Sequence, residues 1–257
     1  MNNFERLYTL KGQIAVIVGG MGHVGFATAK RLATLEARII CLVRKDLSLA
    51  NEKMKELPNY ESLQHFAIKA DVTNSQSLDQ AAEIVLKEAG CCHILINAAG
   101  ITQTIKPNNL SELTDDIFDR ILTTNLRGVY STIRAFAPML KLSNNGLIVN
   151  ISSTASLRAS NSNVAYAAAK AGLNLMTSTL AKALAPEIRI ISIAPGFLEE
   201  ATSGAIRTED FNAGAAKSSP LKRIGNADDI ACTIESCATT MRFATGSLFV
   251  IDGGRTL

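Results

Sequence analysis

The sequence has no apolar run that approaches the roughly 20 residues needed to cross a bilayer. One of its longest runs, Ile190 to Pro195, is already interrupted by Ser192. Near the N-terminus, Glu5 stands where the apolar region of a signal peptide would form. These absences argue against a membrane-spanning chain, and we expect a soluble, cytoplasmic protein that does not bind membranes.

Cysteine pairs and excess charge are also scarce. The chain has five cysteines but no CxxC pair, and we interpret the adjacent Cys91 and Cys92 as reduced thiols at the entrance of a strand. We expect no metal site. A net charge of +3, dispersed along 257 residues, is too small to indicate nucleic-acid binding.

No linker, repeat or low-complexity segment divides the chain, so we expect one domain over residues 1–257. Apolar residues make up 47% of the sequence, enough for a sizeable core. Apolar runs alternate with amphipathic stretches, which predicts the α/β class: a Rossmann-like doubly wound sheet of about seven parallel strands with helices on both faces. The predicted strands are Gln13–Val18, Arg38–Val43, His65–Ala70, His93–Asn97, Leu147–Ile151, Arg189–Ala194 and Leu248–Ile251.

The strongest chemical signal lies between Ser153 and Lys170, after the fifth predicted strand. Tyr166 and Lys170 are four residues apart in a helix of small residues, so they share one face. A nearby ammonium favours the phenolate and lowers the pKa of a tyrosine from its ordinary value of about 10. A tyrosine tuned in this way exchanges a proton with a substrate oxygen. From these two residues alone, the alternative is an ordinary surface pair.

A glycine-rich turn follows the first predicted strand. Its glycines include Gly19, Gly22 and Gly25, and a helix is predicted from about Val24. Glycines let the backbone approach a pyrophosphate, which the helix N-terminus also attracts. The pattern therefore predicts dinucleotide binding, although a tight connection is the alternative. His23 either donates to a phosphate or is simply tolerated at the loop surface.

Motifs further along the chain point to a known family. Ser153 precedes Tyr166 by thirteen residues, Asn97-Ala98-Ala99-Gly100 ends one apolar strand, and Pro195-Gly196 ends another. In their order and spacing these motifs resemble the short-chain dehydrogenase/reductase family, in its compact single-domain form, over nearly the whole chain. The resemblance implies a nicotinamide-dependent oxidoreductase that interconverts a carbonyl and a secondary alcohol by hydride transfer.

The resemblance also assigns catalytic roles. Tyr166 is expected to be the general acid in reduction and the base in oxidation. Lys170 is expected to lower the pKa of the tyrosine and hold the nicotinamide ribose, and Ser153 to hydrogen-bond the substrate oxygen. Asn125 lies inside a long helix predicted from about Thr114, and the resemblance implies that it distorts this helix and binds a water near the lysine.

Cofactor contacts follow from the same resemblance. Asp71, with Val72, is expected to accept from the amino group of adenine; the alternative is that Asp71 caps the next helix. Asn97 is expected to support the backbone beside the cofactor, and Leu198 to lie in a loop over the nicotinamide. Glu200 departs from the family pattern, which commonly has a threonine there, and we expect its carboxylate to point away from the pyrophosphate.

Two polar or irregular segments lie near the expected substrate site. Glu199–Ser219 is the most irregular part of the sequence, and we interpret it as a mobile lid over the substrate. Ser160–Asn163 either lies near a pocket for a hydroxylated substrate or forms a plain surface turn.

The end of the second predicted strand favours NADP over NAD as the cofactor. An acidic residue there binds the ribose hydroxyls of NAD, whereas an arginine favours the 2′-phosphate of NADP. Val43 occupies the position of the acid, and Arg44 and Lys45 follow it. Asp46 is the competing candidate, but it falls past the strand and is better placed to cap the helix that starts near Leu47.

The sequence leaves two alternative functions open and predicts an oligomer. One alternative is a dinucleotide-binding regulator without turnover. The other is a β-ketoacyl-(acyl carrier protein) reductase, which needs a basic docking patch. Arg127, Arg134 and Arg158 either supply such a patch or are ordinary surface arginines. Besides a small-molecule substrate, the expected partner is a second copy of the chain. The helix Val164–Ala185 is apolar around much of its surface, which together with the resemblance implies a homodimer or homotetramer.

Overall fold

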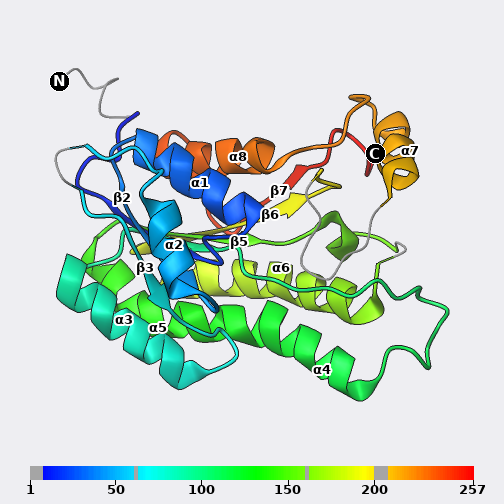
Figure 1. The fold of residues 1–257 in the computed structure, drawn as a ribbon, viewed down its shortest axis with the longest axis horizontal. Coiled ribbons are helices and arrows are strands. Elements are labelled where there is room, and N and C mark those ends of the chain that lie inside the picture. The colour runs from blue at the N-terminus through cyan, green and yellow to red at the C-terminus, as the bar shows by residue number, and fades with distance from the viewer. Residues whose placement is uncertain (1–7, 61–62, 160–161, 200–207) are drawn as a thin grey trace.

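The computed structural model describes residues 8–60, 63–159, 162–199 and 208–257. Its centre is a seven-stranded parallel sheet with the strand order β3-β2-β1-β4-β5-β6-β7 (Figure 1). The strands are β1 (Ile14–Val18), β2 (Arg38–Val43), β3 (Phe66–Lys69), β4 (Ile94–Asn97), β5 (Gly146–Ile151), β6 (Ile188–Pro195) and β7 (Leu248–Ile251). The α/β class and the parallel sheet predicted from the alternating runs are confirmed.

Both faces of the sheet are apolar. Successive residues of a strand point in opposite directions, so in β1 Ala15 and Ile17 pack on one face while Val16 and Val18 pack on the other. All four side chains are buried. This burial on both sides explains why the strands read as continuous apolar runs in the sequence.

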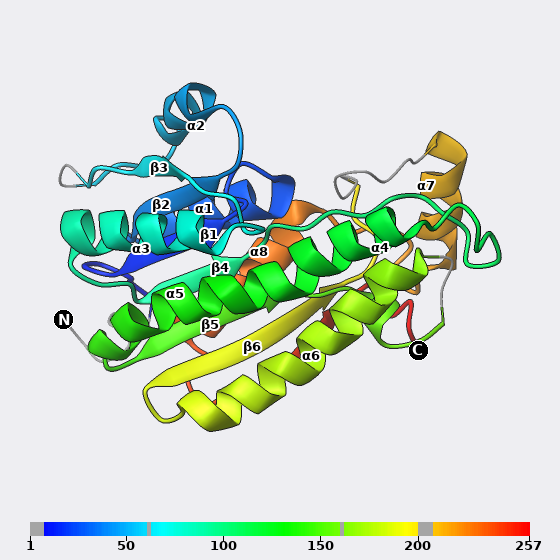
Figure 2. The ribbon, with the colours of Figure 1, turned by 90° about the horizontal axis from the view of Figure 1, so that it is seen from below.

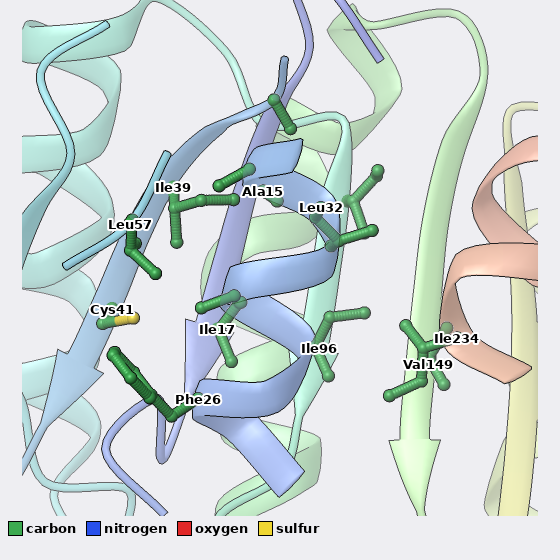
Figure 3. Packing of buried hydrophobic residues seen from close by; sticks show 14 of the residues in the cluster. Ala15, Ile17, Phe26, Leu32, Ile39, Cys41, Leu57, Ile96, Val149 and Ile234 are labelled. Atoms are coloured by element: carbon green, nitrogen blue, oxygen red, sulfur yellow. The ribbon is translucent and has the colours of Figure 1, made fainter. Parts of the chain in front are cut away.

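Helices cover the two faces (Figures 1 and 2). The first face carries α1 (His23–Thr34), α2 (Leu47–Met54) and α8 (Ala227–Thr239), and the second carries α3 (Ser75–Ala89), α5 (Gly128–Leu142) and α6 (Val164–Leu184). Figure 3 shows the first face, where Phe26 of α1 lies against Ile17 and Ile234 of α8 lies against Val149. In the part of the chain that the structure describes, we find no helix with the length and apolar character of a membrane span.

The carboxyl edge of the sheet collects the predicted functional residues. The strand order reverses between β1 and β4, and doubly wound sheets bind ligands at the carboxyl ends of their strands near such a switch point. The glycine-rich turn follows β1, Ser153 follows β5, and Asn97 and Pro195 are the last residues of β4 and β6.

The long helix predicted from Thr114 is interrupted. α4 (Asp115–Leu122) ends in a π-helical turn, η2 (Thr123–Arg127), and α5 begins directly after it. Such turns are rare and occur mostly as single turns within α-helices, frequently at functional sites. Asn125 lies in the middle of this turn. The prediction that the helix is distorted at Asn125 is confirmed.

The segment predicted to be irregular contains a helix, α7 (Glu209–Ser218). Thr208 caps it, because its side chain accepts a hydrogen bond from the backbone N–H of Phe211 at 3.2 Å. The prediction is therefore wrong for this half of the segment. Residues 200–207, among them Glu200, lie outside the described residues, so the lid and the orientation of that carboxylate stay predictions.

Candidate active site

Lys170 of α6 has its ammonium group inside the protein. The residue is 4% exposed, and Nζ donates a hydrogen bond of 2.6 Å to the carbonyl oxygen of Ile151, the last residue of β5. Burial lowers the pKa of Lys170 to about 8. The side chain is therefore still mostly charged at neutral pH, and its cation is held in place by the sheet.

Tyr166 lies one helical turn before Lys170. The lysine Nζ is 5.7 Å from the centre of the tyrosine ring, so the prediction that the two side chains share one face is confirmed. Because Lys170 is buried, the alternative of an ordinary surface pair is wrong. A cation at this distance, in a site partly shielded from solvent, favours the phenolate form of a tyrosine.

Asn125 lies beside the same ammonium, next to Gly100. The asparagine is fully buried; its Oδ1 accepts from the N–H of Ile101 at 2.8 Å, and its Nδ2 donates to the carbonyl of Ile101 at 2.7 Å. A Cβ on Gly100 would lie 3.3 Å from Asn125 Oδ1 and 3.7 Å from Lys170 Nζ. Any side chain at Gly100 would therefore crowd both polar groups.

Asn163 orients the start of α6, a role that we did not predict from the sequence. Its Oδ1 accepts from the backbone N–H groups of Ala165 at 2.9 Å and Tyr166 at 3.2 Å, and its Nδ2 donates to the carbonyl of Gln103. Since Asn163 is 2% exposed, it is not part of a plain surface turn. An asparagine directly before a helical pattern is an N-cap signal that identifies such a residue. Residues 160–161 lie outside the described part of the chain.

Ser153 begins a short 3₁₀ helix, η3 (Thr154–Ser156), at the end of β5. Its Oγ accepts from the backbone N–H of Ala155 at 3.2 Å. This bond uses the oxygen as an acceptor, so the hydroxyl proton is still able to be donated to a ligand. The neighbouring Ser152 fixes the loop, because its N–H donates to the carbonyl of Ile193 in β6 at 2.7 Å.

The glycine-rich turn leaves the N-terminus of α1 uncapped by any side chain. Gly22 is the cap residue, no acidic side chain lies in the first turn, and both Gly22 and His23 are exposed. Val24 packs on the first-face core, and a Cβ on Gly25 would lie within 2.3 Å of the carbonyl oxygen of Gly19. The free N–H groups and the positive end of the helix dipole suit a phosphate. These residues fit the pyrophosphate of a dinucleotide.

The turn also packs against the segment after β4. Gly19 has a φ of +76°, and a Cβ there would lie 2.8 Å from the backbone nitrogen of Ala99. Asn97 supports this segment from within: its Nδ2 donates to Oδ1 of Asn150, whose Nδ2 donates to Oγ1 of Thr177, both at 2.9 Å. The side chain of Asn97 is thus committed to the protein interior.

The end of β2 separates one buried residue from several exposed ones. Val43 is 5% exposed and packs in the first-face core, whereas Arg44 and Lys45 are exposed. Asp46 accepts from the N–H of Leu49 at 2.9 Å and is the cap of α2. The prediction that Asp46 caps this helix is confirmed, and Arg44 is left as the first charged side chain after the strand.

Asp71 does not cap α3, so the alternative role given to it is wrong. The cap is Asn74, whose side chain accepts from the N–H of Ser77. Oδ1 of Asp71 instead accepts from the N–H and the hydroxyl of Thr73, at 2.9 and 2.7 Å. Burial acts to raise the pKa of Asp71, but these bonds and the positive charge of Arg44 lower it overall. Asp71 is therefore an anion at neutral pH.

Val72 and Leu198 contribute packing around the predicted cofactor site. Val72 lies against α5, since a Cβ on Gly128 would be 3.0 Å from the carbonyl oxygen of Val72. Leu198 forms an isolated β-bridge with Gly225, beyond the end of β6. Leu198 is thus on the loop after β6, at the carboxyl edge.

Arg127 and Arg158, two of the three arginines considered for a docking patch, have separate positions. Arg127 donates to the carbonyl of Thr73, just after β3, at 2.9 Å. Arg158 donates to the carbonyls of Arg255 and Thr256, after β7. β3 and β7 are the opposite edge strands of the sheet, so these two arginines do not share a patch.

The five cysteines are all free, including Cys91 and Cys92 directly before β4. Cys92 is fully buried, and burial raises the pKa of its thiol, so it is not a reactive thiolate. Among the residues that the structure describes, no group of three or more histidine, cysteine, aspartate or glutamate side chains is arranged to hold a metal ion.

Comparisons with known proteins point to one family. The family model described as short chain dehydrogenase matches residues 13–210. An uncharacterised short-chain type dehydrogenase/reductase of Sinorhizobium fredii is 31% identical over 253 residues, which cover 95% of this chain and 98% of the relative. A 3-oxoacyl-[acyl-carrier-protein] reductase of Synechocystis is 30% identical over 249 residues, which cover 95% and 97% of the two chains. The crystal structure of a dehydrogenase/reductase from Sinorhizobium meliloti matches with a TM-score of 0.90 and 26% identity over 100% of each chain.

Proposed function

The chain belongs to the short-chain dehydrogenase/reductase family of oxidoreductases, and from this premise we propose that it interconverts a carbonyl and a secondary alcohol, with Tyr166 as the general acid and base. The observation that carries the proposal is the buried ammonium of Lys170, which is fixed by Ile151 and lies 5.7 Å from the centre of the Tyr166 ring. A buried cation at this position favours the phenolate, so the tyrosine is able to release and recover its proton closer to neutral pH.

Each polar group has a step in the proposed reaction. In reduction, Tyr166 donates its phenolic proton to the carbonyl oxygen; in oxidation, the phenolate accepts the proton of the alcohol. Ser153 donates its hydroxyl proton to the same substrate oxygen and holds it near the phenol. Lys170 stabilises the phenolate and would hold the nicotinamide ribose. Asn125 holds the π-turn beside Lys170 and anchors a water that links the lysine to solvent.

A nicotinamide dinucleotide, when bound, supplies or receives the hydride. The uncapped N-terminus of α1 would hold its pyrophosphate, with Gly19 and Gly22 leaving room for the close approach. The Asp71 carboxylate would accept from the adenine amino group. Arg44, exposed after β2, would bind the 2′-phosphate of NADP with its planar fork, which makes NADP the preferred cofactor over NAD.

Nicotinamide absorbance tests the proposal. The protein is mixed with NADPH and a panel of ketones, and separately with NADP and the matching secondary alcohols. Turnover by the wild type that is lost in Tyr166→Phe supports the proposal. Tight NADPH binding with no turnover on any member of the panel favours the alternative, a dinucleotide-binding regulator.

A second candidate is reduction of a 3-oxoacyl group on an acyl carrier protein, because the Synechocystis relative carries that name. Against it, Arg127 and Arg158 lie on opposite sides of the sheet and supply no common docking patch. Rates with a 3-oxoacyl-(acyl carrier protein) and with the same acyl group on a small thiol separate the candidates. A KM that is much lower for the carrier-bound form favours the second.

The proposed enzyme assembles as a homodimer or homotetramer through α6. The inner face of this helix buries Leu173 and Thr177, whereas Leu175 is 70% exposed on the outer face, where Ala168 and Ala171 are also exposed. An apolar side chain among small ones allows two helices to approach closely. Light scattering at micromolar concentration should give the mass of a dimer or tetramer, and a monomer would contradict this assembly.

A further inference from the structure

Two arginines lie together at the carboxyl edge and have no role in the reaction described so far. Arg158 is on the loop that joins Ser153 to Tyr166, and Arg255 follows β7 by four residues. Figures 1 and 2 both place the C-terminus of the chain and α7 at the same end of the molecule. The two arginines belong to the part of this edge formed by β5, β6 and β7.

The backbone around Arg255 is fixed by hydrogen bonds. Arg158 donates through Nη1 to the carbonyl of Thr256 at 3.2 Å and through Nη2 to the carbonyl of Arg255. The carboxylate of Asp252 accepts from the N–H groups of Gly254 at 2.9 Å and Thr256 at 2.7 Å. The position of Arg255 is therefore set by the loop that carries Ser153 and by the end of β7.

The guanidinium of Arg255 is stacked on an aromatic ring. Its central carbon lies 3.8 Å from the centre of the Phe197 ring, and this ring meets that of Phe211 of α7 edge-on at 4.9 Å. Phe197 follows Gly196, which packs against Asp252 so closely that a Cβ would lie 2.7 Å from Asp252 Cβ. Stacking occupies a flat face of the guanidinium and leaves its N–H edge for an acceptor.

No residue that the structure describes accepts a hydrogen bond from the Arg255 side chain, although Arg255 is only partly exposed. Partial burial and the positive charge of Arg158 both act to lower the pKa of Arg255, while Asp252 acts to raise it. The oxygens of Asp252 are already engaged by backbone N–H groups. Two like charges thus lie close together, and their nearby carboxylate forms no direct ion pair with Arg255 among the described residues.

We propose that Arg255, supported by Arg158, binds an anionic group carried by the substrate, a carboxylate or a phosphate. A planar guanidinium with its donors exposed is the partner that binds such groups through two parallel hydrogen bonds. The anion is not the cofactor's pyrophosphate, because the α1 N-terminus follows β1, which β4 separates from β5, β6 and β7. The inference rests on the proposed oxidoreductase function and names its substrate class: a ketone or alcohol with a negative charge away from the reacting carbon.

Matched substrate pairs test the proposal. One pair is a 3-oxo acid and its methyl ester, and the other is a phosphorylated hydroxyketone and its unphosphorylated form; the two pairs distinguish a carboxylate from a phosphate. The wild type should prefer the anionic member of at least one pair. Arg255→Met should then lower kcat/KM for that member by about ten- to a hundredfold, mainly through KM, and change the neutral member by no more than about twofold.

Two further variants separate recognition from structure. Arg255→Lys keeps the charge but not the fork, so it should recover only part of the loss. Arg242→Met removes an arginine that donates to the carbonyl of Thr239 at the end of α8, and it should leave the preference unchanged. An Arg255→Met loss that is equal for anionic and neutral substrates would show a merely structural role and overturn the proposal.

A binding measurement keeps this proposal separate from the proposed function. Calorimetry with malonate and with inorganic phosphate, on protein saturated with NADPH, should show that the wild type binds an anion. Arg255→Met should raise the dissociation constant of that anion by at least about tenfold. If no panel member is turned over but this binding is present, the oxidoreductase proposal fails and the anion site stands. If ketones are reduced but neither anion binds and no anionic substrate is preferred, the anion site is overturned and the oxidoreductase proposal stands.

Discussion

Positively charged side chains have different roles at the amino edge of the sheet, where the parallel strands begin, and at its carboxyl edge, where they end. At the amino edge, Arg38 donates to the carbonyls of Gln64 and Glu88, and Arg189 donates to three carbonyls around the end of α8. At the carboxyl edge, Lys170 is bonded to a single carbonyl and Arg255 to no described acceptor. At the carboxyl edge Arg158 also braces the backbone, whereas Lys170 and Arg255 keep donors for a ligand. The difference shows that the number of backbone partners, rather than the residue type, separates structural cations from candidate functional ones.

Two histidines also hold the backbone at the amino edge, through hydrogen bonds to their imidazole rings. Nδ1 of His65 accepts from the N–H of Ile39 in β2 at 3.0 Å, and Nδ1 of His93 accepts from the N–H of Ile14 in β1 at 3.1 Å. Each histidine directly precedes a strand, β3 or β4, and joins its start to the neighbouring strand. An imidazole nitrogen accepts a hydrogen bond only while it is unprotonated, so this edge depends on neutral histidines.

The largest expected effect comes from Tyr166→Phe at the carboxyl edge. The substitution removes one oxygen, so the fold and NADPH binding should persist while kcat falls by about 10²-fold or more. Steady-state rates and a fluorescence titration with NADPH measure the two quantities. Tyr130→Phe is the matched control, because Tyr130 is 45% exposed on α5 and should keep full activity. A Tyr166→Phe variant with near-normal kcat would show that another group transfers the proton.

Arg44→Ala should have the next largest effect, because Arg44 is expected to keep its donors for the 2′-phosphate. We expect kcat/KM with NADPH to fall by about ten- to a hundredfold, the scale of one charge-assisted hydrogen bond, while the value with NADH is nearly unchanged. Arg134→Ala, which removes an exposed charge from α5, is the control. Equal losses with both cofactors, or a wild type that prefers NADH, would contradict this role.

The smallest effect is expected at the amino edge and concerns stability rather than turnover. Burial lowers the pKa of His65 and His93 below the ordinary 6.5. At His65 the charge of Arg38 adds to the shift in pKa, against the opposing hydrogen bond to the Pro58 carbonyl. As the pH falls through 6.5, the unfolded chain therefore takes up protons before the folded one. The free energy of unfolding should decrease below that pH, by up to about 1.4 kcal/mol per pH unit for each histidine.

Urea unfolding at about pH 7.5 and about pH 5.5 measures this loss. An asparagine places an oxygen that accepts the same N–H bond without titrating, so the double variant His65→Asn/His93→Asn should lose less stability on acidification. His23→Asn is the control, since His23 is exposed at the start of α1 and should leave the pH dependence unchanged. An unaltered acid loss in the double variant would show that other groups cause it.

Much of the fold could be predicted because burial on both faces leaves a direct record in the sequence. The strands Arg38–Val43 and Leu248–Ile251 were predicted with the bounds that the structure has. The helix α7 was not, because its glycine and alanines give little periodic pattern and its start depends on one side chain, that of Thr208. Without the Thr208 cap, the sequence of this segment looks like a loop rather than a helix.

The candidate site was predictable only where it is local in sequence. Tyr166 and Lys170 are neighbours on one helical face, so their spacing was sufficient. The bonds from Arg158 to the chain around Arg255 join residues about a hundred positions apart, and no local pattern indicates them. His65 and His93 accept hydrogen bonds from N–H groups of neighbouring strands, so the role of these histidines depends on the strand order.

The π-turn around Asn125 also has a genetic meaning. A π-helical turn is an α-helix with one residue inserted, and the wider turn absorbs that residue, so the helix on each side keeps its orientation when a residue is removed. Deleting a single codon within Thr123–Arg127 would therefore leave a continuous helix, with α4 still packed on α6 and α5 on the sheet, but would remove the wide turn that places Asn125 beside Lys170. The helix with the π-turn and the regular helix without it differ by one codon. At this turn, a deletion that the fold tolerates would abolish the proposed chemistry.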